Sequence, residues 1–354
     1  MALSIGIVGL PNVGKSTLFT ALTKKGGFAA NYPFATIDPN VGIVPVPDAR
    51  LDTLGKIDKT AKIIPATVEF VDIAGLVKGA SQGEGLGNQF LANIRDTDAI
   101  CEVVRFFSDP DVVHVAGKVD PQSDVETIKM ELILADMATV EKALPRLEKD
   151  SKRDKKLLKK FETAQKVLEG LNEGHRAASL DLNEDEIEEL RDLHLLTMKP
   201  MLYIANVDED QLDADLPQID GTTPVPICAK VEADLAELDA AEAEEYLAAL
   251  GLEESGLTRL VKEAYRLLGL QSYFTSGEIE TRAWTIPIGA KAPQAAGVIH
   301  TDFERGFIKA ETASYEDYVA FDGESGCRSA GKLRQEGKEY VVQDGDVMHF
   351  KFNV

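Results

Sequence analysis

The chain has 354 residues, of which 44% are hydrophobic and 28% are charged, and its formal net charge is −22. This length predicts more than one domain, and the composition is that of a globular protein. No apolar run approaches the roughly 18 residues of a membrane span. The acidic balance argues against a broad nucleic-acid-binding surface. Three widely separated cysteines and the lack of a signal peptide lead us to expect reduced thiols in a cytoplasmic protein that contacts no membrane.

Residues 9–17 (GLPNVGKST) fit the phosphate-loop pattern G-x-x-x-x-G-K-[ST]. The apolar run at 3–8 predicts a buried strand before the loop, and residues 16–23 predict a helix after it. In that context, backbone amides and a helix N-terminus bind phosphate oxygens. We expect Lys15 to reach the β- and γ-phosphates and Ser16 to bind Mg²⁺. The full set of nucleotide-binding residues predicted here is Asn12, Val13, Gly14, Lys15, Ser16 and Thr17.

Two further segments complete the predicted phosphate and metal site. Residues 31–42 contain prolines and a glycine that break regular structure, and Thr36 in this loop is the candidate for a second Mg²⁺ ligand. Residues 67–75 predict a strand that ends in D-x-x-G. There Asp72 would hold Mg²⁺ through water, and the Gly75 amide would sense the γ-phosphate.

The residue that orients the attacking water is not evident from the motifs. Small GTPases usually carry a glutamine after D-x-x-G, but this chain has Leu76, so another group orients the water or the intrinsic rate is slow. The glycine-rich residues 79–91 predict a switch loop followed by a helix, with a plain linker as the alternative. His114, in the loop after a predicted strand at 98–107, is either a group that positions or deprotonates water or a surface histidine.

The predicted strand at 201–205 leads into Asn206-Val207-Asp208-Glu209, where GTPases carry N-K-x-D. The aspartate of that motif binds guanine N1 and N2, and a glutamate one methylene longer does not fit guanine in the same way. Adenine instead presents a donor amine, which Asn206 or a backbone carbonyl accepts. The motif therefore favours ATP over GTP. Residues 226–230 (PICAK) resemble the S-A-K base loop of GTPases, with Cys228 in place of serine.

Between residues 125 and 197 the pattern predicts an antiparallel helical hairpin inserted before the strand at 201. We expect an acidic helix at 183–196 to complete the insertion, and a second acidic helix at 232–250 to pack on the sheet. A basic run lies at the tip of the hairpin, where it is either a solvated helix face or a salt-sensitive contact with RNA phosphates. The run comprises Lys142, Arg146, Lys149, Lys152, Arg153, Lys155, Lys156, Lys159 and Lys160.

The C-terminal part has a different composition, richer in glycine, threonine and aromatic residues. It predicts a strand at 281–286, a helix at 292–303, and strands at 307–311 and 347–352. This order resembles the TGS domain, a β-grasp module of translation proteins, and the resemblance implies an RNA- or protein-binding surface. His300 and His349 are interpreted as structural or surface groups.

Over essentially its whole length the chain resembles the YchF/Obg-like ATPase family, in the Obg branch of the translation-factor GTPases. The segments at 9–17, 31–42, 72–91 and 206–209 carry the resemblance. It implies ATP hydrolysis with Mg²⁺ and adenine contacts from Asn206 and the backbone near Val207. It further implies a catalytic role for His114 and, as a weaker hypothesis, K⁺ held near the phosphates by Asn12.

We therefore predict an α/β protein. A Rossmann-like P-loop nucleotide-binding domain, residues 1–277, carries a helical coiled-coil insertion at about 125–197, and a β-grasp TGS domain spans residues 278–354. The predicted function is a slow ATPase, acting as a monomeric switch on the ribosome or in a stress response. Lys15, Gly75 and His114 are the predicted catalytic residues. Val207 and Glu209 join Asn206 at the base, and Ser16, Thr36 and Asp72 form the metal site. The alternatives are a ribosome- or RNA-binding module in which nucleotide only sets conformation, and a GTP-specific relative.

Overall fold

The computed structural model describes residues 3–25, 40–73, 86–109, 112, 118–154 and 157–353. Contacts divide the chain into two compact units: a first unit of Met1–Gly42 with Glu69–Leu260, and a second unit of Ile43–Val68 with Val261–Val354. These units differ from the predicted domains 1–277 and 278–354, because residues 43–68 and 261–277 group with the C-terminal part. The predicted domain boundary itself stays a prediction.

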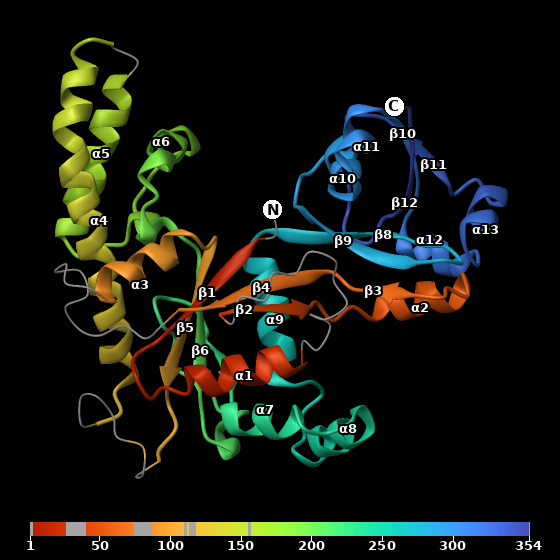
Figure 1. Ribbon diagram of the computed structural model, residues 1–354, viewed down its shortest axis with the longest axis horizontal. Helices are drawn as coiled ribbons and strands as arrows, with labels where there is room; N and C mark the ends of the chain where they lie inside the picture. The colour runs from red at the N-terminus through yellow and green to blue at the C-terminus, as the bar shows by residue number, and fades with distance from the viewer. Residues whose placement is uncertain are drawn as a thin grey trace. The chain divides into compact units, whose positions relative to one another are not determined.

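The first unit is built on a six-stranded sheet in the order β2-β4-β1-β5-β6-β7 (Figure 1). β1 pairs in parallel with β4 and β5, β5 with β6, and β6 with β7. Every residue of β5 and β6 is buried, as expected for strands covered on both faces. Ligands of such sheets bind beyond the carboxyl ends of the strands, which meet at one edge. The strands are β1 (Ser4–Val8), β2 (Val41–Pro45), β4 (Thr67–Asp72), β5 (Ala99–Arg105), β6 (Met201–Asn206) and β7 (Val225–Ile227).

Helices accompany the sheet of the first unit: α1 (Lys15–Lys25), α3 (Leu86–Arg95), α7 (Ala229–Leu235) and α8 (Ala240–Ala249). The helix α9 (Gly256–Leu267) begins in the first unit and ends in the second. The strands and the helix that were predicted around the phosphate loop are confirmed. The prediction of one acidic helix at 232–250 is wrong, because two helices occupy this stretch. The carboxylate of Asp239 accepts hydrogen bonds from the amides of Ala241 and Glu242 and so begins α8 anew.

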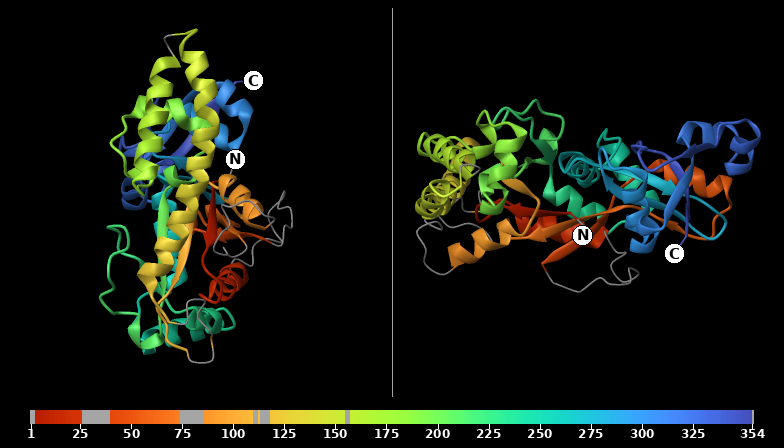
Figure 2. Two further views of the ribbon diagram at one scale, coloured as in Figure 1. Left: turned by 90° about the vertical axis from the view of Figure 1, so that its left-hand side faces the viewer. Right: turned by 90° about the horizontal axis from the view of Figure 1, so that it is seen from above.

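The predicted helical hairpin is confirmed. α4 (Pro121–Ser151) and α5 (Leu158–Asn172) run antiparallel, as Figures 1 and 2 show in yellow and yellow-green. They bury Val140 and Leu147 of α4 against residues of α5 that include Ala164 and Val167. This apolar contact between the helices holds the hairpin together. Its description as a coiled coil stays a prediction.

The acidic helix predicted at 183–196 is shorter than expected. α6 (Glu184–Leu190) begins at a capping box between Asn183 and Glu186 and gives way to a 3₁₀ turn at Arg191–Leu193. His194 then adopts φ 47°, in the left-handed region, which ends the helical path. The sequence pattern gave no sign of this break.

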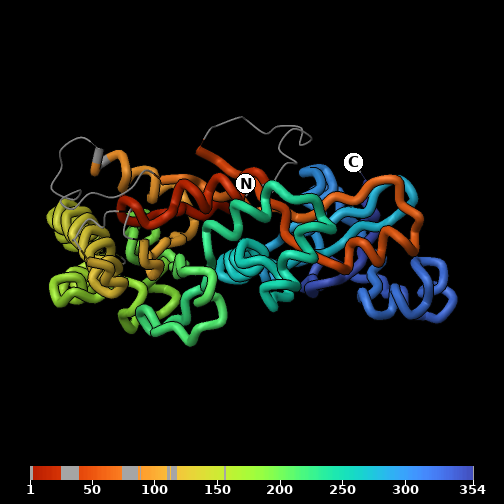
Figure 3. The backbone as a smooth tube through the Cα atoms, turned by 90° about the horizontal axis from the view of Figure 1, so that it is seen from below, coloured from red at the N-terminus to blue at the C-terminus, as the bar shows by residue number. Residues whose placement is uncertain are grey.

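The second unit contains a six-stranded sheet in the order β11-β10-β12-β8-β9-β3. β3 (Ile63–Ile64) comes from the N-terminal half of the chain and pairs with β9, so the orange segment lies beside the cyan and blue ones in Figure 3. The predicted strands at 281–286, 307–311 and 347–352 are confirmed. The other strands are β8 (Leu270–Thr275), β9 (Thr281–Pro287), β10 (Phe307–Ala313), β11 (Arg334–Glu336) and β12 (Val347–Phe352).

One face of this sheet packs against α10 (Ala292–Ile299) and α11 (Thr301–Arg305) through a core that includes Tyr273, Phe307 and Phe350. The single helix predicted at 292–303 is divided at His300, whose Nδ1 accepts a 3.1 Å hydrogen bond from the amide of Asp302 and caps α11. The unit also holds α2 (Ala49–Ile57), α12 (Tyr315–Ala320) and α13 (Glu324–Ser329). The identification as a TGS domain stays a prediction.

The cysteines agree with the expectation of reduced thiols. Cys101, Cys228 and Cys327 are all free and buried. Among the helices in the described ranges, none combines the length and the apolar composition needed to cross a membrane.

Candidate functional site

The loop between β1 and α1 requires glycine at position 14. Gly14 has φ +89°, in the left-handed region, and a Cβ atom there would collide with the side-chain amide of Asn206. Its carbonyl accepts the 3.0 Å hydrogen bond of Leu18 that opens α1. Asn12 also has a positive φ, 63°. The loop therefore turns sharply into a helix N-terminus, the geometry that backbone amides need to surround a phosphate.

Asn206, at the end of β6, fastens this loop to the neighbouring strands. Its Nδ2 donates a 2.8 Å hydrogen bond to the Val13 carbonyl, and its Oδ1 accepts a 3.0 Å bond from the Ala229 amide. The residue is only 5% exposed. Sequence reasoning assigned Asn206 to adenine, whereas the structure engages both polar atoms of its side chain with the backbone. A direct contact with the base stays a prediction.

Lys15 and Asp72, which were predicted to serve phosphate and metal, are brought together. Nζ of Lys15 pairs with Oδ1 of Asp72, and the two side chains are 11% and 23% exposed. The amide of Asp72 donates a 2.7 Å hydrogen bond to the Asn40 carbonyl, which fixes the end of β4. Ser16 follows Lys15 in the first turn of α1 and is exposed. A hydroxyl and a carboxylate are the hard oxygen donors that Mg²⁺ prefers, so these residues fit the predicted metal site.

Several predicted site residues lie outside the described part of the chain. Thr36, the second metal ligand, belongs to the stretch 26–39. Gly75 and Leu76 fall in the stretch 74–85, and His114 falls in the stretch 113–117. Their predicted roles stay predictions.

A cavity of about 1040 Å³ extends from the phosphate loop to the loops that were predicted to hold the base. Gly14 and Thr17 line one part of it, and residues 206–210 and 228–230 line another. The remaining lining residues are Phe107, Ser108, Asp109, Ala233, Asp234, Ala249 and Leu250. Small-molecule sites are typically concave spaces of about 300–1,000 Å³, so the cavity has the size and the lining expected for a nucleotide.

The predicted base residues differ in exposure. Val207 is 1% exposed, and its amide donates a 2.9 Å hydrogen bond to the Ile227 carbonyl. Asp208 accepts a 2.9 Å bond from the Ser108 amide through Oδ2. Glu209 begins a short 3₁₀ turn, Glu209–Gln211, and is exposed at the cavity. Of the side chains that distinguish this motif from N-K-x-D, Glu209 is therefore the one available to a base.

Cys228, where GTPases of this type carry serine, belongs to the base loop at the edge of the cavity and is 5% exposed. Burial raises the pKa of its thiol, against the opposing effect of backbone hydrogen bonds from Val231 and Lys230. The thiol is therefore neutral near pH 7 and fills space beside the cavity. A neutral, buried thiol supports the expectation that the base loop contacts the base through its backbone.

Arg105 is a site residue that sequence reasoning missed. It ends β5 and is 2% exposed, and it faces Asn206 in the strand register. Its guanidinium donates hydrogen bonds to the carbonyls of Phe107, Asp109 and Val112 at 3.3, 3.1 and 3.0 Å. It also lies 4.3 Å from the centroid of the Phe107 ring. One buried cation thus fixes the start of the loop that contains His114. The available signal was a charged residue at the end of a strand in which Glu102 is the one other charged residue.

Family models match both ends of the chain. A model described as a 50S ribosome-binding GTPase matches residues 4–135. A model of the YchF GTPase C-terminal region, described as a protein of unknown function (DUF933), matches residues 270–353.

Curated relatives match over the whole length. The ribosome-binding ATPase YchF of Haemophilus influenzae is 55% identical over 364 residues, and that of Bacillus subtilis is 54% identical over 366 residues. Each alignment covers 100% of this chain and 100% of the relative. The solved structure of the Schizosaccharomyces pombe YchF GTPase superposes with a TM-score of 0.90 at 42% identity, covering 99% of this chain and 97% of that one.

Proposed function

The chain belongs to the YchF family, and on that premise we propose that it is a ribosome-binding ATPase that uses ATP binding and hydrolysis as a switch. The observation that carries the proposal is the cavity that joins the phosphate loop to residues 206–210 and 228–230. We expect the protein to act as a cytoplasmic monomer. Its C-terminal unit, interpreted as a TGS domain, would supply a further surface for RNA or protein.

The phosphate loop and its partners would hold the triphosphate. The amides of residues 12–17 would surround the phosphate oxygens, and Lys15 would bind the β- and γ-phosphates. Ser16, Asp72 and Thr36 would hold Mg²⁺, which when bound neutralises charge on the phosphates. In the ion pair of Lys15 with Asp72, phosphate oxygens would compete for the ammonium group and Mg²⁺ for the carboxylate. The paired charges keep both groups in the site.

Base choice rests on Glu209. The curated relatives are named ATPases and the solved relative is named a GTPase, so the fold alone does not decide between the bases. The aspartate of N-K-x-D bonds guanine N1 and N2, and the longer Glu209 side chain is displaced from that position. Asn206 is held by Val13 and Ala229, so we propose that the backbone near Val207 makes the main adenine contacts.

We propose that His114 positions the attacking water, because Leu76 has no polar atom to do so. Arg105 would support this role by fixing Phe107, Asp109 and Val112 ahead of it. K⁺ near the phosphates, held by Asn12, would add positive charge there. The Gly75 amide would bind the γ-phosphate and so couple its presence to the glycine-rich residues that follow.

A route from this switch to the helical hairpin runs through α3, which follows the glycine-rich residues. Nη2 of Arg95, at the end of α3, lies 3.3 Å from Oγ1 of Thr139 on α4. Nζ of Lys199, just before β6, donates a 3.1 Å hydrogen bond to the Arg95 carbonyl. A shift of α3 with nucleotide state would therefore act at the base of the hairpin.

A second candidate function is a ribosome- or RNA-binding module in which nucleotide sets conformation without significant turnover, and Leu76 is the observation that favours it. Steady-state ATP turnover of the wild type and His114→Ala, with ribosomes and K⁺, separates the two. The ATPase proposal expects measurable turnover in the wild type and its loss in His114→Ala with unchanged ATP affinity. Turnover near zero in the wild type would select the second candidate.

A further inference from the structure

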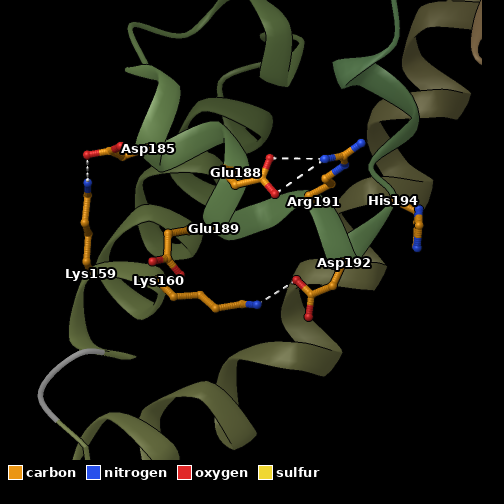
Figure 4. Close-up of a pocket in the computed structure, with 8 residues that line it drawn as sticks. All are labelled: Lys159, Lys160, Asp185, Glu188, Glu189, Arg191, Asp192 and His194. Atoms are coloured by element: carbon orange, nitrogen blue, oxygen red, sulfur yellow. Dashed lines mark hydrogen bonds and ion pairs between the residues drawn. The ribbon is translucent and has the colours of Figure 1, made fainter. Parts of the chain in front are cut away.

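The described residues of the basic run at the hairpin tip fall into two groups, and the first is engaged in ion pairs. Lys155 and Lys156 of this run lie outside the described part of the chain. Lys159 and Lys160 of α5 pair with Asp185 and Asp192 at 3.1 and 2.6 Å, as Figure 4 shows. Lys152 pairs with Glu148 at 2.6 Å. The lysines of α5 thus fasten α6 and the turn after it to α5.

An open cavity of about 730 Å³ lies beside these pairs, and its balance of charges does not favour the binding of a polyanion. Its lining includes Lys159, Lys160 and Arg191, and it also includes the acidic groups of Asp185, Glu188, Glu189 and Asp192 (Figure 4). The acidic groups outnumber the lysines and the arginine. Phosphate groups would therefore be repelled here.

The second group lies on α4 and in the turn that follows it. We name it the α4 basic stripe: Lys142, Arg146, Lys149 and Arg153. All of these residues are exposed, and within the described ranges none forms an ion pair with an acidic residue. Steps of four and three residues place Lys142, Arg146 and Lys149 on one face of α4, and Arg153 follows in the turn beyond its end. At 1.5 Å per residue the helical part of the stripe is about 10 Å long.

The face that carries the stripe is turned away from the rest of the hairpin. Val140, Leu144 and Leu147 belong to the apolar contact with α5 and occupy the opposite side of α4 at the helical period. Glu141 and Glu148 fall on one flank between the two faces, and Asp150 falls on the other flank. The stripe is thus a row of cations with no acidic residue among them, on a chain whose net charge is −22.

We propose that the α4 basic stripe binds the phosphate backbone of RNA on the ribosome. The inference rests on the proposed function, in which the ribosome is the partner. Unpaired cations gain the most from phosphate, because binding breaks no existing ion pair and releases the counterions of the RNA. Arginine adds planar paired donors that match phosphate oxygens. The acidic remainder of the chain confines this attraction to the stripe.

Two full-length variants with the same change of charge test the proposal. Lys142→Gln/Arg146→Gln/Lys149→Gln removes the helical part of the stripe, and Lys152→Gln/Lys159→Gln/Lys160→Gln removes the paired lysines. Glutamine preserves helix propensity, and circular dichroism checks that both variants fold. Binding to ribosomes and to protein-free ribosomal RNA is measured by co-sedimentation over a range of salt concentrations.

We expect the stripe variant to lose at least about tenfold in affinity for both partners. The slope of log K against log salt should become shallower by about 2, from about 0.7 per lost contact with single-stranded RNA. ATP affinity and the control variant should stay close to wild type. Unchanged binding by the stripe variant, or equal losses in both variants, would overturn the inference. A third outcome is that the wild type binds ribosomes through the stripe but does not bind free RNA. The stripe would then contact ribosomal protein, and the inference would be overturned. A wild type that binds no ribosomes would contradict the proposed function itself.

Discussion

The side-chain amide of Asn206 donates a 2.8 Å hydrogen bond to the carbonyl of Val13, 193 residues earlier in the chain. The same side chain accepts a 3.0 Å bond from the Ala229 amide. One buried amide thus joins the phosphate loop to both loops that line the base end of the cavity. We propose that Asn206 acts on the nucleotide by setting the positions of these loops.

This relationship predicts the effect of Asn206→Ala. The change leaves the Val13 carbonyl and the Ala229 amide without their partner, which should lower the free energy of unfolding by about 1–3 kcal/mol for each buried group. ATP and GTP should both bind more weakly and by similar factors, because the scaffold and not the base contact is lost. Urea unfolding and calorimetric titration with each nucleotide measure this. A loss confined to ATP would instead show that Asn206 reads adenine directly.

Lys15→Met should abolish most nucleotide affinity. It removes the cation expected to bind the β- and γ-phosphates and leaves the part-buried carboxylate of Asp72 without its ion pair. We expect ATP to bind at least about 100-fold more weakly, or about 2.7 kcal/mol. Lys24→Met is the matched control, because Lys24 pairs with Glu237 on the surface at the other end of α1. Near-normal ATP binding by Lys15→Met would contradict the phosphate-loop assignment.

Glu209→Asp tests the base contact. Shortening the exposed carboxylate restores the acidic residue of N-K-x-D, so the ratio of GTP to ATP affinity should rise by about tenfold, or about 1.4 kcal/mol. Val207 is left unchanged because it is 1% exposed, and a lysine there would bury a charge. The reverse change Asp213→Glu, at an exposed site outside the cavity lining, should leave the ratio unaltered. An unchanged ratio of GTP to ATP affinity in Glu209→Asp would indicate that the backbone alone selects the base.

Arg105→Lys should destabilise the loop after β5. The ammonium group of lysine is compact and cannot span the carbonyls of Phe107, Asp109 and Val112 as the guanidinium does. We expect the free energy of unfolding to fall by about 1–3 kcal/mol in urea titrations, because the hydrogen bonds from the guanidinium to these carbonyls are lost. Turnover should fall as well if the loop positions His114. Arg191→Lys, which alters an exposed arginine paired with Glu188, should change neither quantity.

The sequence predicted the elements whose signals are local. The phosphate loop fits its motif and lies between an apolar strand and a helix. β5 and β6 are mostly apolar and wholly buried, as expected for strands of a parallel sheet that is covered on both faces. The hairpin follows from helical spacing over a long stretch. In each case the residues that determine the structure are neighbours in the chain.

Features that depend on distant contacts were not predictable. The pairing of Ile63 with Thr281, which places β3 in the second sheet, has no local signal. Asn206 takes its role from loops that only the folded sheet brings close. The partners of Arg105 are near it in the chain, but no motif marks them. The backbone of His194 is in the left-handed region and ends the helical path before residue 196, to which the acidic pattern had extended the predicted helix. The division of the basic run into paired lysines and the α4 basic stripe likewise appears only when α6 is placed against α5.

Calorimetric titration of the purified wild-type protein with ATP and with GTP, each with Mg²⁺, tests the central claim most directly. The account predicts that ATP binds at least about tenfold more tightly, or about 1.4 kcal/mol. Equal affinities would mean that residues 206–209 do not discriminate between the bases as argued. Tighter binding of GTP would contradict the ATPase assignment and make the protein a GTPase.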